Sequence, residues 1–519
     1  MPQKSTGAMP ISVRQAFAID LRSLAALRIA LGLILLIDLA ARATNLSAHY
    51  TDAGVFPRAA RIELDAAEAA SGRGYHWSLH MLSGDRWAQA ALFAVAGCFA
   101  LLLVIGYRTR LSTVASFVLA VSLQSRNPLV IDAGDLILKC LLFWSMFLPL
   151  GARASLDRLL SSDEQPREAI PSIATAALLL QVCMIYWSTA AEKHDAIWAR
   201  DYTALYYMFS IDTFARPLGH WLLRFPRLLT GLTALAYWTE WLGPFLALSP
   251  LGKGRLRVCA VLLFWGLHFG TAITMELGLL PWIAMAAWLP FLPGVVWERL
   301  GAMVSRLSAR CRLNAESQLS VANCLRRWIG RPEKPYTAPR RWTSWLVGLL
   351  LAYTAVWNLN QVTGLLDANF SVPRQWKIAG WVIGIDQSWT MFAPFPMTTD
   401  GWFVMKGVLA DGTTVNLWRP GEPLPWRKPP SPRALAAGRR WAKYLHNLLT
   451  DEGGVYAQGL ADWLRRRWDH DYAGDSPQQR VRSVELVYQI EETLGPGRKS
   501  NLITPYILWR GEYAPDAGP

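Results

Sequence analysis

Long apolar segments constrain this chain of 519 residues more than any other feature of its sequence. A helix of roughly 20 apolar residues crosses the about 30 Å of hydrocarbon in a bilayer. Hydrophobic residues make up 52% of the chain and charged residues only 17%, and there are 26 tryptophans, so most of the chain suits a lipid environment. We therefore expect an all-α polytopic membrane bundle of about nine helices. The expected spans lie near 24–43, 87–105, 111–125, 133–150, 171–190, 229–249, 258–275, 277–296 and 342–359.

The formal charge of +14 indicates membrane topology rather than nucleic-acid binding. Arg and Lys concentrate in the short loops at 106–110, 151–168 and 252–257, in the long loop 297–341 and in the first 20 residues. Under the positive-inside rule these segments share the cytoplasmic side. The sequence thus divides into a cytoplasmic tail (1–20), a transmembrane core (21–296), a basic cytoplasmic loop (297–341), a last transmembrane helix (342–359) and an extracytoplasmic module (360–519).

The first apolar run reads as a retained anchor, because the mixed segment before it is too long for an ordinary signal peptide; a cleaved signal is the alternative. The six cysteines contain no CxxC pair and no metal-ligand spacing, so no metal site is predicted. All of them lie in expected spans or in the 297–341 loop, and the outer module has none: Cys98, Cys140, Cys183, Cys259, Cys311 and Cys324.

The outer module has the pattern of a small α+β unit. Residues 401–418 alternate like two strands joined at Asp411-Gly412, a frequent hairpin turn. Residues 432–468 predict two helices broken at Gly453-Gly454, and residues 482–494 predict a further strand. Residues 201–228 are aromatic but too interrupted to span, so we expect them to lie along the outer membrane interface.

Charged side chains within the expected spans need a partner or a role, because a charge in hydrocarbon costs about 2.5–3.5 kcal/mol on insertion scales. Asp135 and Lys139 are one helical turn apart and are predicted to form a structural ion pair. Glu240 lies in the middle of the sixth span and His268 in the seventh. Each is either a buried helix contact or a group that faces a functional cavity.

The segment "AEKHDAIW" (191–198) places ionisable residues directly after the fifth span, at the expected outer mouth of the bundle. Lys193 is either a helix-end lysine that reaches for lipid headgroups or a general base. Burial in an apolar site disfavours a charged amine, and a neutral Lys193 could accept the proton of a quinol or phenol held in the bilayer.

Several motifs taken together resemble the HTTM family, whose members include vitamin K-dependent gamma-carboxylases. The motifs are "LRIALGLILLIDLA" (27–40), "GYRTRLS" (106–112), "SRNPLVIDAGDLIL" (125–138), "AEKHDAIW" (191–198), "HFGTAITMELGLLPW" (268–282) and "QSWTMFAPFPMTTDGWFV" (387–404). The resemblance covers residues 21–495 and implies the membrane bundle with its outer module.

The resemblance implies that Lys193 is the catalytic base, with His268 as a second catalytic residue. It implies a reduced naphthoquinone, vitamin K or menaquinol, bound near Glu240, Trp198 and Asn127, whose reaction with O2 drives carboxylation of an exported protein. It also implies a bacterial inner membrane. This sequence departs from the carboxylase pattern in two respects: no histidine follows Asn127, and the outer module lacks the cysteines of the carboxylase bridge.

Two functions therefore remain open. The chain is a quinol-dependent, carboxylase-like enzyme, or it is a non-catalytic membrane protein that binds a lipid or quinone or helps an exported partner to mature. A transporter is a third reading, without the inverted repeat that many transporters show.

Overall fold

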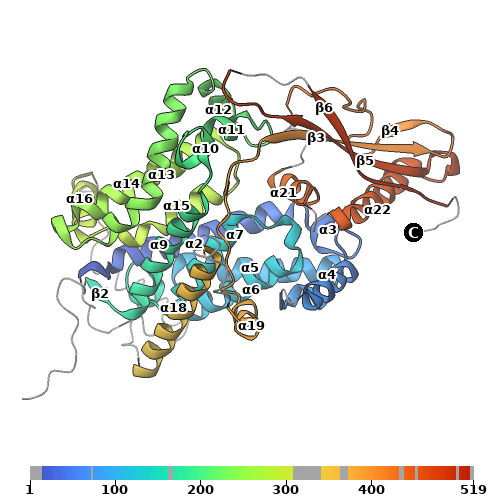
Figure 1. Ribbon diagram of the computed structural model, residues 1–519. Helices are drawn as coiled ribbons and strands as arrows, with labels where there is room; N and C mark the ends of the chain where they lie inside the picture. The colour runs from blue at the N-terminus through green and yellow to red at the C-terminus, as the bar shows by residue number, and fades with distance from the viewer. Residues whose placement is uncertain are drawn as a thin grey trace, which may run out of the picture.

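The computed structural model describes residues 15–71, 74–161, 168–307, 340–362, 372–431, 438–450, 454–497 and 502–514. Figure 1 shows a helical part and, at one end of it, a twisted sheet with two helices beneath it. Most of the basic loop predicted at 297–341 and the cysteines at 311 and 324 lie outside the described residues.

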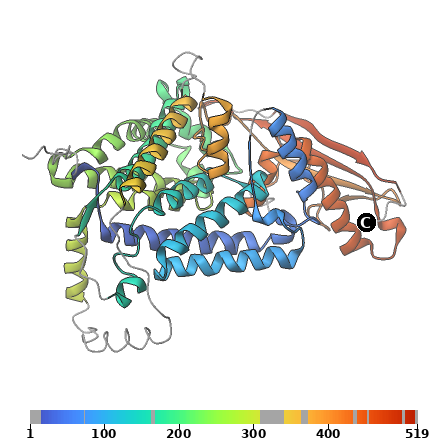
Figure 2. The same cartoon turned by 90° about the horizontal axis from the view of Figure 1, so that it is seen from below.

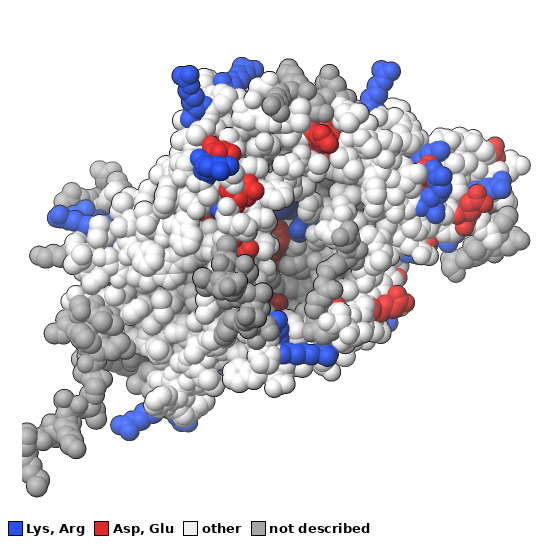
Figure 3. Space-filling model, viewed as in Figure 1, with Lys and Arg blue, Asp and Glu red and all other residues white. Residues whose placement is uncertain are grey.

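Four described helices are long and apolar enough to cross a membrane: α2 (Leu21–Ala43), α5 (Arg86–Ile105), α9 (Ile173–Glu192) and α14 (Arg255–Thr274). They correspond to the spans predicted at 24–43, 87–105, 171–190 and 258–275. A fifth crossing results if a bent pair of helices, Leu280–Phe291 and Gly294–Met303, is counted as one span. In the view of Figure 3 the helical part presents few charged side chains, which suits a lipid-facing surface.

The other predicted spans are helical but less suited to crossing. Helix α7 (Ala133–Ser145) has only 13 residues. The span predicted at 277–296 is broken into α15 (Leu280–Ala287), η4 (Leu289–Phe291) and α16 (Gly294–Leu307), with a bend of 102° where Pro290 and Pro293 lack backbone donors. Three other helices are long enough but less apolar than the four candidate spans: α6 (Thr109–Arg126), α13 (Pro226–Leu248) and α18 (Arg341–Val362). Length and composition thus support four or five crossings, and the count of nine remains a prediction.

Helices α2 and α5 lie side by side (Figure 2). Asp20 caps the first turn of α2 by accepting a hydrogen bond from the backbone N–H of Arg22. Arg28, one polar residue of α2, is fully buried and donates to the carbonyls of Leu103 and Val104 at the carboxyl end of α5, at 2.6 and 2.5 Å. A guanidinium there satisfies carbonyls that have no partner within the helix.

Short elements connect the long helices. The strands β1 (Ala18–Asp20) and β2 (Ala169–Pro171) pair antiparallel near the start of α2. The stretch 201–228, predicted not to span, holds two short helices and the first three residues of α13. The structure describes all of its residues, and none belongs to a candidate span. The short helices are α3 (Leu46–Tyr50), α4 (Arg58–Ala70), α8 (Leu156–Leu160), α10 (Ala196–Ala199), α11 (Ala204–Ser210) and α12 (Pro217–Leu222).

The C-terminal part is an antiparallel sheet with the order β4-β3-β5-β6. The hairpin predicted at Asp411-Gly412 joins β3 (Thr399–Leu409) to β4 (Thr414–Asn416), and Gly412 takes the positive φ of +88° that the turn requires. The strand predicted at 482–494 is β5 (Val481–Glu492), whereas β6 (Ile503–Glu512) was not predicted. The two predicted helices are α21 (Arg439–Asn447) and α22 (Ala457–Trp468), which Figure 1 shows on one side of the sheet.

The sheet and its helices share a hydrophobic core with the helical part. Trp441 of α21 and Leu460 of α22 belong to the same buried cluster as Tyr50 of α3 and Phe93 of α5. The C-terminal part is therefore joined to the bundle through apolar contacts rather than through its linker alone.

The segment that precedes the sheet also packs into the bundle. After α19 (Arg374–Ile383), the side chains of Ile385 and Trp389 lie in the main helical core. Gln387 accepts a hydrogen bond from Gln181 of α9 at 2.8 Å. The division predicted at residue 360 thus assigns to the outer module a stretch whose side chains complete the helical part.

Candidate functional site

Lys193 lies at the carboxyl end of α9, where it is the C-cap residue. Its Nζ donates to Glu240 Oε1 at 2.7 Å and to Oε2 at 2.6 Å, and Glu240 lies on α13. Lys193 is 4% exposed and Glu240 is 7% exposed, so the two charges face each other away from solvent. The two predicted site residues therefore form one buried ion pair.

Trp198 completes the surroundings of this pair. Asp195 caps α10 by accepting from the backbone N–H of Ile197 at 2.8 Å, and the turn places Trp198 against the lysine. Lys193 Nζ lies 4.3 Å from the centre of the Trp198 ring, within range of a cation–π interaction. The indole N–H of Trp198 donates to the carbonyl of Phe392 at 2.8 Å. The segment before the sheet thus holds one wall of the site in place.

The four consecutive ionisable residues of the motif have different surroundings. Lys193 is buried, Glu192 and Asp195 are partly exposed, and His194 is exposed. The lysine is therefore the member of the group that faces the protein interior. The alternative of a lysine reaching for lipid headgroups is wrong for this structure.

His268 belongs to an adjoining group of aromatic residues. Its Nε2 lies 2.6 Å from Tyr186 Oη, and Tyr186 Oη accepts from the indole N–H of Trp288 at 3.0 Å. Since the tyrosine oxygen already accepts from Trp288, its hydroxyl hydrogen is available for the histidine nitrogen. Tyr186 lies on α9, the helix that ends at Lys193, and His268 lies on α14, which packs against the α13 helix of Glu240. Together, Lys193, Glu240, Trp198, Tyr186, His268 and Trp288 are called the Lys193 cluster.

Asn127 has a structural environment of its own. Its side chain donates to the carbonyl of His49 at 2.9 Å and accepts from the backbone N–H of Leu129 at 3.1 Å. These contacts make it the cap of the short helix η2 (Pro128–Val130). Among the described contacts, none joins Asn127 to the Lys193 cluster.

The predicted ion pair between Asp135 and Lys139 is wrong, since each side chain has another partner. Asp135 accepts from Arg42 at 2.6 Å and from Arg440 of α21 at 2.5 Å. Lys139 donates to Asp386 at 2.9 Å. Asp135 also accepts from the backbone N–H of Asp132, the N-cap residue of α7, at 2.9 Å, so both of its oxygens already have donors.

Arg42, Asp38, Asp135 and Arg440 form a buried network that links α2, α7 and α21. Arg42 also pairs with Asp38 at 2.7 Å, and Arg440 pairs with Asp38 at 2.6 Å. The four-residue spacing of Asp38 and Arg42 is visible in the sequence, but the contribution of Arg440 from 305 residues beyond Asp135 is not. This network joins the C-terminal part to the bundle by charge as well as by apolar contact.

A third group has the composition of a metal site. Ligand atoms of Asp65, Glu68 and His76 lie within 4.8 Å of one another. Arg61 already pairs with Asp65 at 2.6 Å and approaches Glu68 at 4.0 Å, and His76 Nδ1 lies 3.4 Å from Glu68, so each of the three residues has a contact within the protein. We assign no metal to it.

Chemically, the Lys193 cluster combines an acid–base pair with aromatic walls. A carboxylate and an ammonium at hydrogen-bond distance can exchange a proton with a bound hydroxyl group and can stabilise the anion that results. Trp198 lies over the lysine, whereas Tyr186 and Trp288 are buried beside it, with the Trp288 ring stacked on Phe264 at 4.0 Å between ring centres. This donor and acceptor set fits a phenol or quinol.

The chain matches no protein-family model, and comparisons with curated proteins and with solved structures give no match. Membership of the HTTM family remains a prediction that depends on the motifs.

Proposed function

We propose that this chain is an HTTM-type membrane protein that removes the proton of a membrane-soluble phenol or quinol at the Lys193–Glu240 pair. The buried, bidentate contact between Lys193 and Glu240 beside Trp198 carries the proposal. A reduced naphthoquinone would supply the electrons for reaction with O2, as in vitamin K-dependent carboxylation.

We propose different tasks for the two charged residues. Glu240 is the acceptor of the pair, so its carboxylate takes the phenolic proton when the substrate hydroxyl displaces one of its two contacts with Lys193. The ammonium of Lys193 then lies next to the phenolate and stabilises its charge. This differs from a neutral lysine acting alone, because the amine of Lys193 is bound to a carboxylate oxygen at 2.6 Å.

Topology forms the second element of the proposal. Orientation by the positive-inside rule puts Lys193 at the extracytoplasmic ends of the helices, in a bacterial inner membrane, where an exported protein could be the acceptor of carboxylation. The lipid bilayer would be the route by which the quinol arrives.

The test is O2 consumption by the purified protein in lipid nanodiscs with menaquinol. Wild type should consume O2, and Lys193→Ala and Glu240→Gln should each abolish the quinol-dependent rate. Lys139→Ala is the matched control, because it also removes a lysine from an ion pair but lies outside the cluster. An inactive wild type, or full activity in both cluster variants, would exclude the proposal.

The second candidate is a non-catalytic protein that binds a quinone or lipid or assists an exported partner. The observation that favours it is the joining of the C-terminal part to the bundle through Arg440 and a shared core, which suits a scaffold. It predicts that Lys193→Ala leaves the cellular phenotype unchanged, whereas Arg440→Ala, which loosens the C-terminal part, abolishes it.

A further inference from the structure

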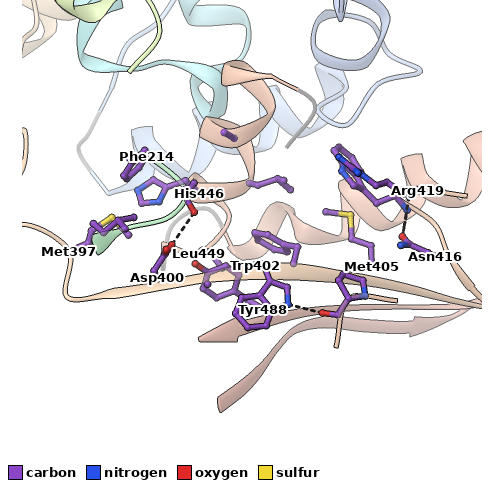
Figure 4. Close-up of a pocket in the computed structure, with 18 residues that line it drawn as sticks. Phe214, Met397, Asp400, Trp402, Met405, Asn416, Arg419, His446, Leu449 and Tyr488 are labelled. Carbon is purple, nitrogen blue, oxygen red and sulfur yellow. Dashed lines mark hydrogen bonds between the residues drawn. The ribbon is translucent and has the colours of Figure 1, made fainter. Parts of the chain in front are cut away.

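A pocket of about 70 Å³ lies between β3, β5, α21 and the turn at 211–214 that follows α11 (Figure 4). Phe214, Trp402, Trp418 and Tyr488 contribute aromatic rings to its lining. The pocket is separate from the Lys193 cluster, and it belongs to the part of the molecule in which the sheet meets the bundle. Its lining residues therefore form a second candidate binding site.

Asp400 brings a buried carboxylate to this apolar lining. It is 4% exposed, and its oxygens accept from the backbone N–H of Asp212 at 2.5 Å and from Thr213 Oγ1 at 3.0 Å. Each carboxylate oxygen can accept a second hydrogen bond. Burial raises the pKa of Asp400 to about 6, so at neutral pH the group is mainly an ionised acceptor.

Basic groups near the pocket disfavour a cationic ligand. Arg419 lines the pocket, and the guanidinium of Arg439 lies 5.5 Å from the centre of the Phe214 ring. His446 also lines it, and burial lowers its pKa to about 4, so that the imidazole is neutral at pH 7. A neutral ligand that carries a hydrogen-bond donor suits these surroundings better than an ammonium group.

The size of the pocket limits the ligand to a small ring. A single water occupies about 10–15 Å³ on this scale, and an engineered cavity of about 150 Å³ holds benzene. The pocket has about half the volume of the benzene-holding cavity and is partly open, so it can enclose part of a six-membered ring while the rest of the ligand stays at its mouth.

We propose that this pocket binds a phenolic ring, with the ring among Phe214, Trp402 and Tyr488 and the hydroxyl group donating to Asp400. The phenol could be a free small molecule or the side chain of a tyrosine in a polypeptide. The proposal is independent of quinol chemistry at Lys193, since it depends on binding alone.

The test is a binding titration of the full-length protein in nanodiscs, with empty nanodiscs subtracted. 4-Methylphenol should bind at least tenfold more tightly than toluene, which has the ring but no hydroxyl. Asp400→Asn should weaken 4-methylphenol at least tenfold and leave toluene unchanged, which also shows that the pocket is still folded. Leu449→Trp should fill the pocket and abolish both, and Asp411→Asn at the exposed hairpin turn should change neither.

Titration with N-acetyltyrosinamide separates the two sources of the ring. Binding of this compound more tightly than 4-methylphenol supports the proposal with a polypeptide as the source, and the reverse order supports it with a small phenol. Absence of saturable binding by either phenol, equal affinities for 4-methylphenol and toluene, or an unchanged affinity in Asp400→Asn would each overturn it.

Discussion

The ion pair between Lys193 and Glu240 gives the sharpest energetic prediction. Replacing Glu240 by Gln keeps the size of the side chain but leaves a buried ammonium without its counter-charge. Breaking a buried pair in this way costs about 3–5 kcal/mol, because the remaining charge is left without compensation. An ordinary hydrogen bond between membrane helices contributes only about 0.6 kcal/mol. The two magnitudes differ enough for one measurement to distinguish them.

A double-mutant cycle isolates the pair from other effects of each substitution. We expect Glu240→Gln and Lys193→Met each to lower the free energy of unfolding by about 3 kcal/mol or more, and the double variant to lose much less than their sum. Unfolding is measured in mixed micelles under reversible conditions.

The pair of Lys139 and Asp386 provides an internal comparison. The side chain of Asp386 is 24% exposed, against 10% for that of Glu240, so Lys139→Met leaves a carboxylate that water can still solvate. The variant Lys139→Met should therefore lose less free energy of unfolding than Lys193→Met. Single-variant losses below about 1 kcal/mol that simply add in the double variant would refute the reasoning.

Three further predictions concern the rest of the molecule. Arg440→Gln should cost about 3 kcal/mol and make the C-terminal part more sensitive to protease, with a smaller effect for Arg439→Gln, whose closest carboxylate contact is 3.8 Å. The pKa of Asp400 is raised from 3.8 to about 6, so the free energy of unfolding falls as the pH rises through this range. The pKa of His446 is lowered from 6.5 to about 4, so this group makes the free energy of unfolding fall as the pH falls. Because other buried groups titrate in the same range, the test is the difference between variant and wild type: Asp400→Asn should make the change of melting temperature with pH between pH 4 and 6 more positive than in wild type, and an unchanged slope would contradict the assignment. Gly32→Ala would bring a Cβ within 2.6 Å of a side chain of α5, so it should destabilise the bundle by about 1–3 kcal/mol in the same unfolding assay.

The local pattern of the sequence was sufficient to locate many of the elements. Apolar runs predicted the positions of α2, α5, α9 and α14, and alternation with Asp411-Gly412 predicted the hairpin of β3 and β4. Such signals depend on neighbouring residues in the chain, so they can be read without knowledge of the fold. The strand β6 was missed because Pro505 interrupts its pattern and its first half is exposed.

The sequence also identified most residues of the candidate site but not their arrangement. Lys193, Glu240, Trp198 and His268 were singled out as polar or aromatic residues in apolar surroundings, or by their motif. Which of them touch could not be predicted, since Lys193 and Glu240 are separated by 47 positions. Tyr186 was missed because an aromatic residue in a membrane helix gives no signal of its own.

The sequence by itself determined that the chain has several membrane-length apolar helices, a C-terminal α+β part and a lysine at the end of the fifth apolar segment. Only the tertiary structure decided that this lysine pairs with Glu240, and that Asp135 pairs with Arg42 and Arg440 rather than with Lys139. The physical reason is that helix and strand formation follow from hydrogen bonds and burial within a few turns of chain. The partner of a buried charge, in contrast, is set by how distant elements pack, and no local periodicity encodes that choice.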